Sequence, residues 1–108
     1  MIVNMKDQRI FKWLEAGGFH RIINKGKWIE RGSIIYAKEI EQNTYLLFVE
    51  IKGSTPNDIQ AFIVEFESLD SIGKYEPLQI MFYMSIKNIQ DLLYFEKYLE
   101  IPIPVDHC

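Results

Sequence analysis

Four apolar segments of strand length dominate the pattern of hydrophobic and polar positions along the chain. They cover residues 33–41, 44–52, 59–67 and 78–86. A two-residue link, Gln42-Asn43, joins the first pair, and links rich in turn-forming residues join the others. Because links of this kind suit antiparallel neighbours, the pattern predicts a four-stranded antiparallel meander.

Two amphipathic helices are predicted, one at each end of this block. The first covers residues 5–16 after an Asn4 cap, and Gly17-Gly18 ends it. Its apolar stripe consists of Ile10, Phe11 and Leu14. The second is capped by Asn88 and ended by Pro102, and its stripe consists of Ile89, Leu92, Leu93, Phe95 and Leu99. The order of elements predicts one α+β domain over residues 1–108, with the N- and C-terminal helices packed on one face of the sheet.

Residues 19–31 form a basic segment with a weaker strand pattern. Two short apolar runs flank Asn24-Lys25-Gly26, a sequence that suits a hairpin turn. Such a hairpin would extend the sheet to five or six strands. Lysine and arginine on a short hairpin are also typical of an ordinary edge strand that is protected against aggregation.

The Gln42-Asn43 link predicts a register and thereby two faces of the sheet. It places Ile40 opposite Tyr45 and Tyr36 opposite Val49. One face, which includes Leu47, Phe62 and Val64, is then almost wholly apolar, and we assign it to the two helices. A one-residue slip would exchange the faces of the first strand.

The opposite face is apolar at its centre and acidic toward one end. Its central residues are Phe48, Ile63, Met81 and Tyr83, and its carboxylates are Glu39, Glu41, Glu65 and Glu67. This centre holds more apolar surface than solvent usually meets. The basic segment, a second copy of the chain or a different protein could cover it.

Charge is distributed unevenly along the chain. Residues 1–38 hold eight basic and three acidic side chains, which gives +5, whereas the other seventy hold four and twelve, which gives −8. The two sets either form separate surfaces or interdigitate and cancel. A basic surface with interleaved aromatic rings would suit nucleic acid, and its contact residues would be Arg21, Lys25, Lys27, Trp28 and Arg31. The net charge of −3 disfavours this alternative.

Histidine, cysteine and carboxylate positions indicate no catalytic chemistry. His20 and His107 have no spacing typical of a metal site or a catalytic pair, and Cys108 is the last residue. Carboxylates on an open sheet lack the pocket that acid–base chemistry requires. We therefore predict no catalytic residue, no metal site and no cofactor.

These patterns favour a small cytoplasmic binding protein without catalysis, of the inhibitor, immunity or adaptor type. A single cysteine fits a reducing compartment, and no apolar run is long enough to cross a membrane. The partner would be another protein or a second copy of the chain. The expected contact residues are the anchors Phe48, Ile63, Met81 and Tyr83 with the charged rim Glu39, Glu65 and Glu67.

Overall fold

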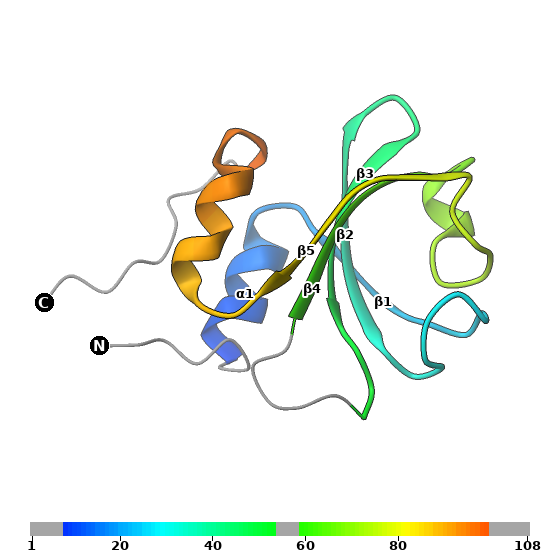
Figure 1. Ribbon diagram of the computed structural model, residues 1–108, viewed down its shortest axis with the longest axis horizontal. Coiled ribbons are helices and arrows are strands. Elements are labelled where there is room, and N and C mark those ends of the chain that lie inside the picture. Colours follow the sequence, from blue (N-terminus) through cyan, green and yellow to red (C-terminus); the bar gives the residue numbers. More distant parts are fainter. Residues whose placement is uncertain (1–7, 54–58, 100–108) are drawn as a thin grey trace, which may run out of the picture.

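The computed structural model describes residues 8–53 and 59–99 (Figure 1). Within these ranges the chain forms α1 (Gln8–Ala16), β1 (His20–Ile23), β2 (Ile34–Glu41), β3 (Thr44–Glu50), β4 (Ile59–Glu65), the short 3₁₀ helix η1 (Leu69–Ser71), β5 (Gln79–Ile86) and the 3₁₀ helix η2 (Ile89–Tyr98). The predicted helix cap at Asn4 and the predicted helix end at Pro102 lie outside the described residues. The side chains of Ile10, Phe11 and Ile89 are likewise outside the described part.

The five described strands form one antiparallel sheet in the order β1-β2-β3-β4-β5. The α+β meander predicted from the sequence is therefore confirmed. α1 and η2 lie on one side of the sheet, and η1 lies on the other with the loop that follows β1 (Figure 1). We call these the helix side and the loop side. β1 and β5 are the two edges of the described sheet.

The basic segment contributes one strand instead of the expected hairpin. β1 pairs with β2, but residues 24–33 form a loop, which we call the Asn24 loop. The buried Asn24 side chain explains the difference, because its amide donates to the carbonyls of Ile29 at 2.8 Å and Glu30 at 3.2 Å. These bonds close a wide loop in place of a tight turn.

Both predicted helix boundaries that fall on described residues are confirmed. Gly18, at φ +93°, takes the left-handed conformation that follows α1. At the other end, Asn88 accepts a hydrogen bond from the Gln90 backbone, and Asp91 accepts one from the Asn88 backbone. This reciprocal pair is the capping box of η2.

The buried stripe of η2 is narrower than the sequence predicted. Leu92 and Phe95 are buried, whereas Leu93 is 50% exposed. The helix has 3₁₀ geometry, in which side chains three residues apart eclipse one another. Residues 92 and 95 therefore share one ridge, and Leu93 is turned away from it.

The predicted register of the first hairpin is wrong by one residue. Glu41 does pair with Thr44 across the two-residue link, but Glu39 pairs with Tyr45, so the bulge falls at Ile40. The Glu39 carboxylate accepts a hydrogen bond from the Asn43 backbone at 3.1 Å, which ties the bulged strand to its turn. Tyr36 consequently lies opposite Phe48 instead of Val49.

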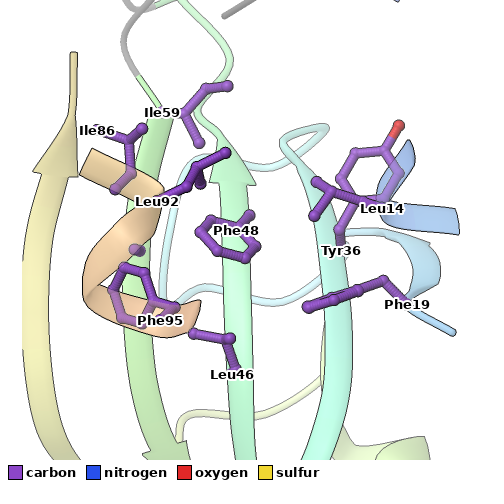
Figure 2. Close-up of a cluster of buried hydrophobic side chains, with 10 residues drawn as sticks. Leu14, Phe19, Tyr36, Leu46, Phe48, Ile59, Ile86, Leu92 and Phe95 are labelled. Atoms are coloured by element: carbon purple, nitrogen blue, oxygen red, sulfur yellow. The ribbon is translucent and has the colours of Figure 1, made fainter. Parts of the chain in front are cut away.

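This slip reverses the faces that were assigned to β3 and β4. Phe48 lies on the helix side, and Leu47 and Phe62 lie on the loop side. The helix-side cluster consists of Leu14, Phe19, Tyr36, Leu46, Phe48, Ile59, Ala61, Ile86, Leu92 and Phe95 (Figure 2). The loop-side cluster consists of Ile35, Ala37, Tyr45, Leu47, Val49, Phe62, Val64, Phe66 and Ile72.

Two loops cover the loop side of the sheet. Trp28 from the Asn24 loop packs on this cluster, and so does Leu69 of η1. The two loops are joined, because the backbone N–H groups of Lys25 and Gly26 both donate to the carbonyl of Gly73, at 2.7 and 2.9 Å. The basic segment therefore does cover the second face, and it does so together with residues around η1.

Candidate functional site

The structure does not bring the four expected anchor residues together on one exposed face. Phe48 is buried on the helix side, where its ring centroid lies 5.5 Å from that of Phe95 and 5.6 Å from that of Phe19 (Figure 2). Ile63 packs on the same cluster and is half-buried. Phe48 is therefore a core residue, with no surface to offer a partner.

Met81 and Tyr83, the other two expected anchors, are exposed on β5. Met81 is 45% exposed and Tyr83 is 54% exposed. The Tyr83 ring lies 5.1 Å from that of Phe62, which places it on the loop side, opposite to Phe48. The sequence thus identified two accessible residues, and Tyr83 lies on the side away from the helices, as predicted, but it does not share that side with Phe48.

The expected acidic rim is divided between the two sides of the sheet. Glu39 pairs with Tyr45 of the loop-side cluster. Glu65 follows Val64, a loop-side residue, so alternation along β4 places it on the helix side. Glu67 is exposed beyond the end of β4. Across residues 8–53 and 59–99, no three His, Cys, Asp or Glu side chains gather closely enough to hold a metal ion.

Side chains of the basic segment also make contacts within the fold. The ring of Trp28 is half-buried and meets Phe62 and Phe66 edge-on, at 5.0 and 6.0 Å. The guanidinium of Arg31 donates twice to the Lys25 carbonyl. Trp28, the ring expected to stack on a base, therefore contributes to the packing of the loop side.

Arg21, Lys25 and Lys27 are exposed. Arg21 and Lys25 line an open hollow of about 340 Å³ together with Lys74. The other residues that line it are Ile22, Ile23, Ile72 and Gly73. The hollow brings three cationic side chains together at the β1 edge. His20 is exposed on the same strand, and His107 and Cys108 lie outside the described residues.

Among the described residues, the most distinctive surface is β5 together with Leu78, which directly precedes it. Every residue from Leu78 to Tyr83 is exposed, and five of these six are apolar. The exposed fractions of the four central side chains lie between 42% and 54%, for Ile80, Met81, Phe82 and Tyr83. Across the described sheet, this is the strand with the most exposed apolar side chains.

β5 also lacks the devices that normally protect an edge strand. It has eight residues and no charged side chain, whereas β1 to β4 each carry at least one. β1, the opposite edge, has only four residues and exposes His20 and Arg21. Short length and positive charge discourage further strand pairing, so β1 is a protected edge and β5 is an open one.

The two faces of β5 are apolar as well. Phe82 pairs with Ile63 on the helix side, and its ring lies 6.0 Å from that of Phe95. Tyr83 and Ile80 pair with Phe62 and Val64 on the loop side. A strand that is apolar on both faces is typical of a sheet with a layer packed on each side, and at an edge it leaves part of these apolar side chains exposed.

The sequence contained this signal, although its pattern alone did not single out the edge. Residues 78–86 contain no charge, and a meander places its last strand at an edge.

No helix in the described part of the chain is long and apolar enough to cross a membrane. No protein-family model matches this chain, and no curated protein or solved structure matches it either.

Proposed function

We propose that this chain is a small protein-binding module without catalysis, of the inhibitor, immunity or adaptor type, and that it binds by pairing β5 with an extended strand of a partner polypeptide. The observation that carries the proposal is the open edge of β5, eight residues long and uncharged. This edge takes the place of the acidic sheet face that the sequence suggested.

Addition of a partner strand would use both the backbone and the exposed apolar side chains of β5. The outer side of an edge strand presents unpaired N–H and C=O groups, which a partner strand satisfies by main-chain hydrogen bonds. Side chains on alternate faces then select the partner. Phe82 on the helix side and Tyr83 on the loop side favour a strand that is apolar on both faces.

The expected affinity is moderate. Ile80, Met81, Phe82 and Tyr83 are each about half exposed, so covering one of them stabilises a complex by roughly 1 kcal/mol. Association costs on the order of 4–15 kcal/mol, which exceeds what these side chains supply. Main-chain hydrogen bonds of about 1 kcal/mol each and apolar side chains of the partner must add to them. A dissociation constant of about a micromolar is consistent with these terms.

Capture in the native host tests the proposal. A tagged full chain and an untagged full chain are expressed together, and the polypeptides retained by the tag are identified by mass spectrometry. Met81→Lys places a charge at the centre of the edge and is expected to reduce the retained polypeptides by at least tenfold. Tyr75→Lys is the matched control, because Tyr75 is 68% exposed but lies outside β5.

The outcomes separate clearly. Retention by the unmodified chain and by Tyr75→Lys, with loss for Met81→Lys, supports the proposal. Equal retention by all three baits, or no specific retention by the unmodified chain, contradicts it. Circular dichroism of both variants checks that the sheet is intact.

A further inference from the structure

We propose that the strand paired with β5 is β5 of a second copy of this chain, in antiparallel orientation. This inference rests on the proposed function and specifies its partner. The two sheets would join into one continuous sheet related by a two-fold axis perpendicular to it. Such an axis reverses the strand direction and keeps each face of the sheet on its own side.

The arrangement of side chains on β5 suits this symmetry. Helix-side residues of one copy lie beside helix-side residues of the other, and the same holds for the loop side. Since β5 is apolar on both faces, each face of the joint strand pair would be apolar across both copies. No charged residue lies between Leu78 and Ile86, so the axis brings no like charges together along the strand.

The charged residues that flank β5 favour one register of the proposed pair of β5 strands. Glu76 lies three residues before the first residue of β5 and Lys87 directly follows its last residue, and both side chains are exposed. Antiparallel pairing brings the beginning of one strand beside the end of the other. The register that places Glu76 opposite Lys87 of the second copy forms two symmetric contacts between opposite charges.

The bulge in β5 is compatible with that same register. In a regular strand, residues 76 and 87 differ by an odd number and would point to opposite faces. However, the pairing of β4 with β5 shifts between Ile63 and Val64, where Met81 is the additional residue. As a result Ile80 and Tyr83 both lie on the loop side, three residues apart.

The register can be followed residue by residue. With Glu76 opposite Lys87, Ile80 lies opposite Tyr83, and both belong to the loop side. Gln79 lies opposite Met84, and both belong to the helix side, since Gln79 pairs with Glu65 and Met84 packs on the helix-side cluster. Met81 and Phe82 meet at the axis. The two facing pairs on either side of this central pair therefore each share a face.

The oligomeric state of the full chain tests the inference. Sedimentation equilibrium with light scattering is expected to show a mass that rises with concentration toward that of two chains for the unmodified protein and for Ile23→Lys, a control at a 48% exposed position of β1, the opposite edge strand. Met81→Lys brings two lysines close to the axis, so we expect it to raise the dissociation constant at least tenfold. Glu76→Lys and Lys87→Glu are each expected to weaken the dimer by roughly tenfold through two symmetric contacts, and the double variant to restore most of the affinity.

A zero-length carbodiimide cross-link tests the register itself. Equal amounts of ¹⁴N- and ¹⁵N-labelled chains are mixed, cross-linked and digested. The eight-residue strand β5 alone spans roughly 23 Å, and Glu76 and Lys87 lie beyond its opposite ends, so a Glu76–Lys87 link is expected to join two copies. We expect this link in peptides that combine both isotopes. Its absence from a cross-linked dimer overturns the register.

The inference and the proposed function fail in different ways. A monomeric chain that captures another polypeptide through β5 overturns the inference and supports the function. A dimer that Met81→Lys leaves intact also overturns the inference. A monomeric chain with no β5-dependent partner overturns both.

Discussion

Trp28 stands edge-on against Phe62, with ring centroids 5.0 Å apart. The contact joins the Asn24 loop to the middle of β4 and covers the loop side of the sheet. A sheet with one open face needs a second layer to exclude water from that face. In this molecule the second layer consists of the Asn24 loop and the residues around η1, and Trp28 is one of the side chains that pack it on the sheet.

Replacement of this ring is expected to destabilise the fold. Trp28→Ala removes a half-buried ring that packs on Phe62 and Phe66, and we expect a loss of about 2–3 kcal/mol in the free energy of unfolding. Urea denaturation followed by circular dichroism measures it. Lys27→Ala, at the exposed neighbouring position, serves as the control and should change stability by less than about 0.5 kcal/mol. Equal stability of the two variants would contradict the role given to Trp28.

Asn24 is expected to contribute nearly as much to the stability of the fold, through its side-chain hydrogen bonds. Its buried amide donates to the carbonyls of Ile29 and Glu30, so Asn24→Ala leaves these acceptors without that partner. We expect a loss of about 2 kcal/mol. Thermal and urea unfolding measure the loss. Since the Asn24 loop is bonded to Gly73, hydrogen exchange should also accelerate around η1. Unchanged exchange there would show that the two loops are not coupled.

Alkaline pH is expected to weaken the fold through Tyr45. Burial raises the pKa of Tyr45 above its ordinary value of 10.0, and the carboxylate of Glu39 raises it further. The folded state thus retains the phenolic proton at a pH where the unfolded state releases it. The stabilisation is complete below about pH 10 and is lost as pH rises through the folded-state pKa.

Urea denaturation at pH 8 and pH 11 tests this linkage. The unmodified chain should lose more stability between the two pH values than Tyr45→Phe, which has no proton to release at this position. Burial also raises the pKa of Tyr36, while its hydrogen bond with Arg21 lowers it, so Tyr36→Phe provides a comparison at a second buried ring. Equal losses for Tyr45→Phe and the unmodified chain would exclude a contribution from Tyr45.

Element order was predictable because each boundary has a local cause. The capping box at Asn88 and the left-handed Gly18 are set by a few neighbouring residues, and the two-residue link at Gln42-Asn43 forces an antiparallel turn. The bulges at Ile40 and Met81 were not predictable from alternation. Strands that are apolar on both faces carry little period-two signal, so a one-residue slip leaves the pattern equally acceptable.

The register decided which site residues were accessible. Phe48 was expected on the surface because the predicted hairpin lacked the Ile40 bulge, and the observed pairing places it in the core. Met81 and Tyr83 are exposed because β5 is an edge strand, whichever face each side chain takes. Strand order was thus a firmer guide to accessibility than the assignment of faces.

Hydrogen exchange along the two edges provides the last prediction. Alternate backbone N–H groups of an edge strand point away from the sheet and exchange quickly unless another strand accepts their hydrogen bonds. In a dilute sample we expect fast exchange for alternate residues of both β1 and β5. In a concentrated sample, the outward-pointing groups of β5 should become protected while those of β1 remain fast.

β1 is therefore an internal control within the same molecule, since its four residues and its Arg21 discourage pairing. Met81→Lys should remove the concentration dependence at β5 and leave β3, a central strand, fully protected. Protection of β5 that is equal at all concentrations would mean that the chain covers its own edge. Protection that appears at β1 instead would mean that the chains associate through β1, the basic edge. Either result would contradict pairing through β5, because only association of separate chains makes protection at that strand depend on concentration.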